Sequence, residues 1–379
     1  MPRWKIRPQE AWGKPMPKCR PMHTKRPLVA RIDSAALTHN LGVARLAASG
    51  ARVLAVIKAN AYGHGLLRAA AALSQADGFA VLTLDEALVL RGAGFSHPIV
   101  LLEGFFSPDE IEAFAHARLR PVVHREDQIT LLEYSRPSHR IDVLLKIDTG
   151  MHRLGIAPGR VLPALERLRS CSHVGSITLM THFACADDDT IGVSAQMTQF
   201  TTATAGLDLP TCLANSAALL RHPQTRGDWV RPGIMLYGAS PFAAQTGADL
   251  GLLPAMSLES RLIAVRRIHK GEGLGYGHAF IAPQDMNIGV VACGYADGYP
   301  RHAPTGTPIW VEGRETRTLG RVSMDMLCVD LAPCSNAHVG SPVTLWGGDL
   351  PVERVAAAAG TIAYELFTAL APRVSCEEI

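Results

Sequence analysis

The chain has 379 residues, of which 47% are hydrophobic, 19% charged and 6% aromatic. This length exceeds one ordinary hydrophobic core and predicts two domains, and the composition is that of a globular protein, which excludes a fibrous or wholly disordered chain. The formal net charge of +3 is spread along the sequence, so no nucleic acid or other polyanion is expected as a partner.

The N-terminal segment is strongly basic. Residues 1–26 contain eight lysines and arginines against one acid, Glu10, with prolines interleaved and no apolar segment of the kind that a secretory signal needs. We interpret residues 1–26 as a disordered basic extension. A basic interaction arm, or a true start of translation at Met22, are the alternatives.

From about residue 53, short apolar runs of β type alternate with segments of helical period, as in βα units around a parallel sheet. Eight such strands predict an α/β fold, a TIM-type (β/α)8 barrel over residues 27–255, with an open doubly wound sheet as the alternative. The expected strands are 53–58, 79–82, 99–102, 121–123, 141–147, 176–181, 211–214 and 230–237, and the expected helices are 84–92, 108–117, 125–134, 161–168 and 193–203.

After residue 254 the pattern changes to short β-type runs separated by Gly, Pro and Asp turns. We therefore expect a mainly-β second domain over residues 256–379, closed by a helical stretch at 352–370 that Gly360 interrupts. Its expected strands are 258–268, 288–293, 309–312, 326–331 and 342–346.

The eight cysteines lie far apart without a C-x-x-C pair, and no apolar run reaches the roughly 20 residues that cross a bilayer. Reduced thiols in a cytoplasmic protein are therefore expected, with no membrane contact and no metal site.

The first predicted barrel strand leads into Lys58, within the run AVIKANAYGHG at residues 55–65. Active sites of such barrels lie at the carboxyl ends of the strands. Burial there lowers the pKa of an ammonium group, and a neutral lysine amine is the nucleophile of Schiff-base chemistry. Lys58 is thus a candidate nucleophile, although a lone lysine at a strand end more often simply reaches out to solvent.

Residues 55–65 resemble the pyridoxal 5'-phosphate (PLP) attachment motif of the alanine racemases, and the resemblance continues in register from about Leu28 to the C-terminus. It implies that Lys58 carries PLP and that the enzyme interconverts L-alanine and D-alanine by proton transfer between two bases on opposite faces of Cα. Tyr276 resembles the second base. It stands in the sequence LGYGH, where the flanking glycines permit a tight, exposed loop.

Other residues match the cofactor site of the family. Tyr62 would donate a hydroxyl to the phosphate, and Asn215 and Ser216 open a predicted helix whose N-terminus suits an anion, although a plain N-cap explains this pair equally well. At the ring nitrogen the family position is Arg231, which is always charged and never accepts a hydrogen bond, so it leaves that nitrogen unprotonated. The resemblance also assigns cofactor contacts to Gly233, Ile234, Tyr364 and His182, the last paired with an arginine to activate the tyrosine base.

The fifth predicted strand ends in KIDTGMHRLG, and its Arg153 matches a family residue that binds the substrate carboxylate. Lys146 matches a lysine that is carbamylated in many relatives, which places an anion beside that arginine. Met324 and Asp325 resemble substrate contacts, and the resemblance implies an access corridor lined by Asp187, Tyr295, Arg301 and Arg321.

In this family each active site is completed by a tyrosine and a methionine of a neighbouring subunit, which implies a C2 homodimer with shared sites. Three alternatives stay open, namely a PLP-dependent amino-acid decarboxylase, a non-catalytic PLP carrier, and a broad-specificity racemase that also accepts serine. One hydroxyl changes discrimination by only ~1–3 kcal/mol, so the sequence does not rank alanine over serine. Nor does it separate supply of D-alanine for peptidoglycan from its catabolism.

Overall fold

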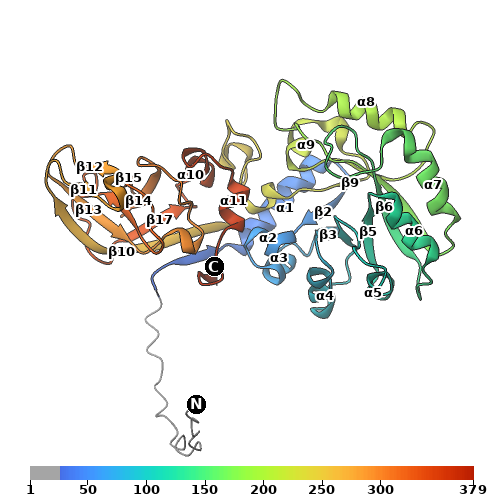
Figure 1. Cartoon of the computed structure of the whole chain (residues 1–379), viewed down its shortest axis with the longest axis horizontal. Helices are drawn as coiled ribbons and strands as arrows, with labels where there is room; N and C mark the ends of the chain where they lie inside the picture. Colours follow the sequence, from blue (N-terminus) through green and yellow to red (C-terminus); the bar gives the residue numbers. More distant parts are fainter. Residues whose placement is uncertain (1–25) are drawn as a thin grey trace, which may run out of the picture.

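The computed structural model describes residues 26–379, so the predicted basic extension lies, except for Arg26, outside the described residues. A parallel barrel with helices around it and a mainly-β domain follow one another along the long axis of the molecule (Figure 1). The predicted fold class, a TIM-type barrel followed by a mainly-β domain, is confirmed.

Eight short parallel strands close the barrel, and β9 pairs with β2 to complete the ring. Most of their residues are buried, as expected of parallel strands covered by helices. The strands are β2 (Arg52–Val56), β3 (Gly78–Val81), β4 (Ile99–Leu101), β5 (Leu119–Val123), β6 (Ile141–Lys146), β7 (Val174–Met180), β8 (Thr211–Cys212) and β9 (Trp229–Val230).

The helices predicted around the barrel all form. Thr83 and Glu86 make a capping box at the start of α4, whereas α5 begins at Glu110 rather than at 108, because Glu110 accepts a hydrogen bond from the amide of Phe106 and closes a turn there. The helices are α1 (Ser34–Ala48), α2 (Lys58–Tyr62), α3 (Leu66–Ala72), α4 (Leu84–Gly92), α5 (Glu110–His116), α6 (Glu126–Tyr134), α7 (Val161–Ser170), α8 (Ser194–Ala203) and α9 (Ser216–Arg221).

The long helix α1 was not predicted, because a polar residue occupies its buried face. Asn40 is fully buried, where it donates to the carbonyls of Leu236 and Leu253 and accepts from the amide of Leu253 at 2.8 Å. These bonds satisfy the side chain, so burial carries little penalty. In the sequence, however, Asn40 breaks the apolar period that identifies an amphipathic helix.

The last predicted barrel strand, 230–237, is wrong over most of its length. β9 ends at Val230, and Ile234–Tyr237 form a turn of 3₁₀ helix. Pro232 lacks an amide proton for a sheet, and the amide of Gly233 donates to the hydroxyl of Ser216 instead of to a strand. The apolar residues of this segment are buried as a helical turn, which a short apolar run does not distinguish from a strand.

The β domain contains all five predicted strands, with small shifts at their ends, and further strands that were not predicted. β10 pairs with both β17 and β13, so these strands curl toward a closed ring. β1, within the predicted barrel range 27–255, instead joins this sheet beside β10 and β18. The strands are β1 (Val29–Ile32), β10 (Met256–Ile268), β11 (Gly273–Leu274), β12 (Phe280–Ile281), β13 (Met286–Val291), β14 (Pro308–Val311), β15 (Arg314–Leu319), β16 (Leu327–Asp330), β17 (Pro342–Trp346) and β18 (Ser375–Glu378).

Two helices near the C-terminus return to the barrel. α10 (Val352–Ala358) and α11 (Ala363–Thr368) are separated at Gly360, where the sequence predicted a break. In Figure 1, α11 lies between the β domain and the barrel, beside α2. Among residues 26–379 no helix combines the length and the apolar character that a membrane crossing requires.

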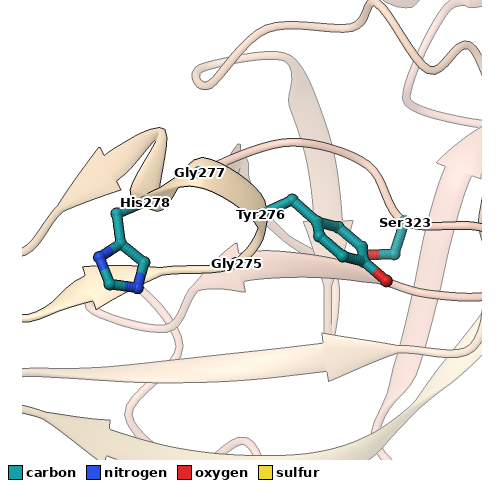
Figure 2. A pocket seen from close by; sticks show the side chains of 5 residues that line it. All are labelled: Gly275, Tyr276, Gly277, His278 and Ser323. Carbon is teal, nitrogen blue, oxygen red and sulfur yellow. The ribbon is translucent and has the colours of Figure 1, made fainter.

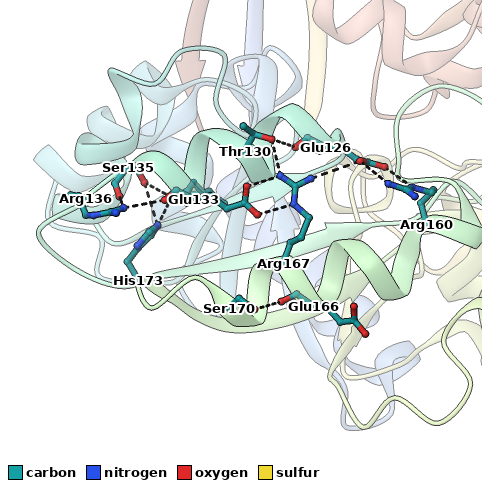
Figure 3. A network of polar contacts seen from close by, with 11 residues as sticks. Glu126, Thr130, Glu133, Ser135, Arg136, Arg160, Glu166, Arg167, Ser170 and His173 are labelled. Carbon is teal, nitrogen blue, oxygen red and sulfur yellow. Dashed lines mark hydrogen bonds and ion pairs between the residues drawn. The ribbon is translucent and has the colours of Figure 1, made fainter.

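An ion-pair network joins α6 and α7 on the outside of the barrel (Figure 3). Arg167 contacts Glu133 at 2.7 Å and Glu126 at 3.8 Å, and Arg160 pairs with Glu126. All of these side chains are partly solvated, so each pair contributes little to stability, and the network mainly fixes the register of the two helices.

Gly63 allows α11 to approach the turn after β2. Its φ is +80°, and a Cβ there would lie 2.3 Å from the carbonyl oxygen of Phe367. Gly50 has φ +96° with open space around it. We predict that Gly50→Ala lowers the free energy of unfolding by about 1–2 kcal/mol, from backbone strain alone, and Gly63→Ala by roughly 2–5 kcal/mol, because the contact adds overpacking. Urea denaturation measures both values, and equal losses would contradict this account.

Candidate active site

Lys58 lies just beyond the carboxyl end of β2. The strand ends at Val56, two residues before the end of the predicted strand, and Lys58 opens the short helix α2. The three residues after Lys58 have φ between 52° and 55°, so this turn is left-handed. A left-handed turn costs about 1–2 kcal/mol for each non-glycine residue. Strain of this kind is concentrated at functional sites.

The electrostatic surroundings of Lys58 favour its neutral amine. Burial, and then the nearby charge of Arg153, lower the pKa of Lys58, while Glu103 and Glu86 act in the opposite direction. The net direction is downward, as nucleophilic use of a lysine requires.

Lys58 stands in the wall of a cavity of about 850 Å³ at the barrel mouth. This volume lies within the range of about 300–1,000 Å³ that small-molecule sites occupy. The cavity brings together every residue that the sequence assigned to the cofactor, with Lys146 and Arg153: Lys58, Tyr62, Lys146, Arg153, His182, Asn215, Ser216, Arg231, Gly233, Ile234 and Tyr364.

One part of this cavity is a cradle of hydrogen-bond donors. The amide of Gly233 donates to Ser216 Oγ at 2.8 Å, which leaves the hydroxyl proton of Ser216 for a ligand. Asn215 caps α9 directly beside it, as predicted. A Cβ on Gly233 would lie 2.7 Å from Tyr62 Oη, so a side chain at 233 would fill the cradle. Burial raises the pKa of Tyr62 to about 12, and its phenol therefore stays a donor.

Positive charge exceeds negative charge in the cavity wall. Lys146 is 5% exposed, and burial, followed by the charges of Arg231 and Arg153, lowers its pKa to about 8. Unpaired buried charge is costly, so this excess favours an anionic ligand. The charged lysines, arginines and carboxylates that line the cavity are Lys58, Lys146, Arg153, Arg231, Glu103 and Glu365.

Arg231 is 3% exposed and lies across the carboxyl ends of three strands, where its guanidinium donates to the carbonyls of Thr181 and Leu213. Its Nη2 also lies 3.3 Å from His182 Nδ1. Since arginine is a cation without an acceptor, this contact favours the tautomer that turns the lone pair of Nδ1 toward it and has the ring proton on Nε2. Burial and the charge of Arg231 lower the pKa of His182 well below its usual value, so its ring is neutral.

Gln196 on α8 holds the two loops that follow β6 and β7. Its amide nitrogen donates to the carbonyl of His182 and to Thr149 Oγ1, both at 3.1 Å, and its oxygen accepts from the amide of Ala184 at 2.8 Å. The backbone of His182 is thereby fixed from outside the cavity. The sequence did not single out this glutamine, because a polar residue on a helix gives no sign of its tertiary partners.

Tyr276 does not lie in this cavity. It projects from the turn between β11 and β12, is 70% exposed, and lines a separate hollow of about 550 Å³ with its glycine neighbours, His278 and Ser323 (Figure 2). Gly275 and Gly277 have φ of 68° and 66°, as the predicted tight loop requires. A single copy of the chain therefore keeps the two predicted bases in different pockets.

The remaining predicted residues also lie outside the cavity. Met324 is 52% exposed and Tyr295 37% exposed, on neighbouring loops of the β domain. Asp325 accepts a hydrogen bond from Arg373 at 2.7 Å. Arg321 lies against the Tyr276 turn, since its Nη1 is 3.2 Å from the position of a Cβ on Gly277. Arg301 and Asp187 are exposed, the first in the β domain and the second in the loop after β7.

The sequence missed both carboxylates in the cavity wall, Glu103 and Glu365. Glu103 lies two residues after the end of β4 and lines the cavity near Lys58. The rule that drew attention to Lys58, a polar residue at the carboxyl end of a barrel strand, applies equally to Glu103. No motif at that position indicated it.

Comparison with known proteins places the chain among enzymes of one activity. Residues 32–241 match the family model for the alanine racemase N-terminal domain, and residues 255–377 match that for the C-terminal domain. The alanine racemase of Thiobacillus denitrificans is 59% identical over 354 residues, which cover 93% of this chain and 96% of that protein. The catabolic alanine racemase of Klebsiella aerogenes is 52% identical over 350 residues, 92% of this chain and 98% of that protein.

Among solved structures, biosynthetic alanine racemase from Pseudomonas aeruginosa matches with a TM-score of 0.92 at 45% identity, over 94% of this chain and 100% of that one. The alanine racemase of Acinetobacter baumannii matches with a TM-score of 0.89 at 37% identity, over 94% and 100% of the two chains.

The contact between Arg231 and His182 predicts an unusual histidine titration. In protein labelled with ¹⁵N-histidine, His182 should remain neutral at pH 6, with its proton on Nε2, because its pKa lies well below 6.5. In Arg231→Gln the titration should move toward higher pH, since one of its two main causes is removed. Nitrogen chemical shifts followed by NMR distinguish the tautomers, and protonation of His182 near pH 6.5 in the unaltered protein would refute the assignment.

Proposed function

Because the chain belongs to the alanine racemase family and interconverts L-alanine and D-alanine, we propose that it does so with PLP held by Lys58 and with Tyr276 of a second copy as the opposing base. The observation that carries the proposal is the amine of Lys58, which has a lowered pKa and stands in a cavity rich in cations beside a cradle for an anion. Relatives named as racemases favour this activity over a decarboxylase or a carrier.

The cavity fits PLP by the chemistry of its donors. Ser216, Tyr62 and the backbone around Gly233 would hold the phosphate. A side chain at position 233 would collide with Tyr62, so glycine keeps this space open. Arg231 would face the ring nitrogen as a donor only. When bound, PLP withdraws electrons from the Cα of an amino acid attached to it and so acidifies the Cα–H bond.

The residues of the chain then divide the remaining tasks. Arg153 would bind the substrate carboxylate through its planar fork. Nζ of Lys58 would take or return the Cα proton on one face, and Oη of Tyr276 would do so on the other. His182 Nε2–H, fixed by the bond from Arg231 to Nδ1, would donate to the phenolate form of Tyr276 and stabilise it.

A second copy of the chain is part of this proposal. Tyr276 and Met324 are exposed and lie outside the cavity of their own chain, so they suit a role in the site of a neighbour in a C2 homodimer. Asp325, and the corridor formed by Asp187, Tyr295, Arg301 and Arg321, would complete that shared site.

We also propose a cytoplasmic location, because the cysteines of the described residues are free thiols, as expected in a reducing compartment. Racemisation equilibrates the two enantiomers, so the same site would serve either the supply of D-alanine for peptidoglycan or its catabolism.

The two-base proposal predicts an asymmetric loss of proton exchange. In D₂O the holoenzyme should exchange the Cα proton of both alanine enantiomers. Tyr276→Phe should slow removal from one enantiomer by about 100-fold or more, since a general base contributes at least that much, while the other keeps its Lys58 base. Tyr134→Phe, at an 82% exposed tyrosine on α6, is the matched control. Equal losses for both enantiomers would reject the assignment of Tyr276.

Mixing two inactive variants tests whether the sites are shared. If Tyr276 serves the neighbouring copy, a hybrid of Lys58→Ala and Tyr276→Phe subunits contains one site with both bases intact. Equal mixing with subunit exchange should then recover about a quarter of the unaltered activity, since half of random dimers are hybrids with one working site. Mixtures that remain inactive after demonstrated exchange would mean that each chain supplies both bases.

Lys146 is suited to carbamylation. Its pKa of about 8 leaves about a tenth of the amine neutral at pH 7, far more than an unperturbed lysine. The neutral nitrogen would bond to the carbon of CO₂ and release a proton, giving a carbamate anion. That anion would offset the nearby charges of Arg153 and Arg231, which gives the modification an electrostatic reason.

The proposed carbamate predicts a pH-dependent signal. With ¹³C-bicarbonate, the protein should show a carbamate resonance that grows as pH rises from 6.5 to 8.5, because the folded pKa is lowered and more amine is deprotonated over that interval. Lys146→Arg should lack it, whereas Lys270→Arg, at an exposed lysine, should keep it. A resonance that survives Lys146→Arg would assign the carbamate elsewhere.

A further inference from the structure

Two arginines from opposite ends of the described chain meet at one buried carboxylate. Asp297, in the loop after β13, has no exposed surface, and its Oδ1 accepts from Arg373 Nε at 2.7 Å and from Nη1 of Arg26. Its other oxygen accepts from the amide of Gly294 at 2.8 Å. Both oxygens of Asp297 are therefore engaged.

The same arginines also hold the loop between β15 and β16. Arg373 Nη2 donates to Asp325 Oδ1 at 2.7 Å, and Arg26 Nη2 donates to the backbone carbonyl of Asp325. Arg373 thus bridges two carboxylates, Asp297 and Asp325, with separate nitrogens of one planar group. Such a fork sets the relative position of the two loops, which a single point charge does not.

The backbones of the two loops are joined as well. The amide of Tyr295 donates to the carbonyl of Ser323 at 3.0 Å, and the amide of Ala296 donates to the carbonyl of Met324 at 2.9 Å. A Cβ on Gly294 would lie 2.4 Å from both of those carbonyl oxygens, so the two loops are in direct contact. The two loops therefore form one connected unit, with the side chains of Tyr295 and Met324 on its exposed surface.

The bond to Asp297 is a strong one. Burial alone would raise the pKa of this carboxyl, yet hydrogen bonds from Arg26 and Arg373 hold it below its usual value. Removing one partner of a buried ion pair leaves a charge poorly compensated. Arg26 would remain on Asp297 if Arg373 were replaced, so the fold should survive the loss while the link to Asp325 is broken.

We propose that Arg373 is a positioning residue for the racemase reaction, which sets where Met324, Asp325 and Tyr295 stand and thereby how closely the active site of the neighbouring copy fits the substrate side chain. The inference rests on the proposed function, in which these residues reach the site of the other copy. Arg373 itself touches neither of the two pockets described above.

The β domain offers a matched control. Arg317 on β15 donates to Asp330 at 3.1 and 3.2 Å, and the side chain of Asp330 is 8% exposed. This is also an arginine on a mostly buried aspartate, but it joins two strands rather than the loops that carry Met324 and Tyr295. Replacing either arginine should lower the stability of the protein. Only replacement of Arg373 should also change how the active site fits its substrate.

The experiment compares holoenzymes of Arg373→Gln, Arg373→Lys and Arg317→Gln. Arg373→Gln should raise KM for alanine roughly tenfold with a smaller change in kcat, and should raise kcat/KM for serine relative to alanine, because a displaced loop loosens the pocket. Hydrogen exchange of peptides covering 294–299 and 320–327 should become faster. Arg317→Gln should leave KM, the serine-to-alanine ratio and exchange in these loops unchanged.

In Arg373→Lys the positive charge is kept, but the lysine binds only one carboxylate at a time. This variant should therefore have the thermal midpoint of the unaltered protein, whereas its KM should return only in part to the unaltered value. Unchanged KM and loop exchange in either Arg373 variant, or the same changes in Arg317→Gln, would overturn the proposal. Failure of the proposed function is a separate result, because proton exchange in Tyr276→Phe would then be lost equally for both enantiomers. If only the positioning role of Arg373 fails, the loss of exchange in Tyr276→Phe remains asymmetric.

Discussion

Uncompensated positive charge at the barrel mouth is the constraint on which the site depends. Two lysines and two arginines line a largely buried cavity with only two carboxylates, and each cation lowers the proton affinity of its neighbours. Burial first, and the neighbouring cations second, lower the pKa of Lys58, of Lys146 and of His182. The same excess disfavours an empty cavity and favours a ligand with a phosphate and a carboxylate.

The fold was predictable wherever local pattern and tertiary role agree. Barrel strands that are buried on both sides appear in the sequence as short apolar runs. After residue 254 the short β-type runs are separated by glycine and proline turns, and this change marks the second domain. Prediction failed where a tertiary partner decides the local structure. Asn40 satisfies buried carbonyls on α1, and the segment after Val230 leaves the sheet because its amides face Ser216. β1 and β18 pair across almost the whole chain length, which no local signal reveals.

The candidate site divides in the same way. Residues at the carboxyl ends of strands, such as Lys58 and His182, were accessible from the barrel rule together with motif resemblance, and the structure brings them into one cavity. The roles of Gln196 and Arg373 were not accessible from the sequence, because the residues that each contacts are 12 or more positions away along the chain. Glu103 was accessible in principle and was overlooked. The proposed partnership of Tyr276 with a second copy depends on how two chains assemble, and neither the sequence pattern nor the structure of a single chain contains that information.

The proposed assignments separate cofactor binding from racemisation. Most of the cavity wall, including the cradle at Gly233, the arginine at 231 and the lysine at 58, belongs to the barrel, so a single copy contains the groups that we propose to hold PLP. The proposed second base, Tyr276, lies on a loop of the β domain, away from that cavity, and the neighbouring loops are held by arginines from the two ends of the described chain. In the proposed dimer, assembly would therefore have a chemical task beyond stability. One base alone can remove and return a proton on one face of Cα, and inversion requires the opposite face to be served by a group held rigidly enough to meet it.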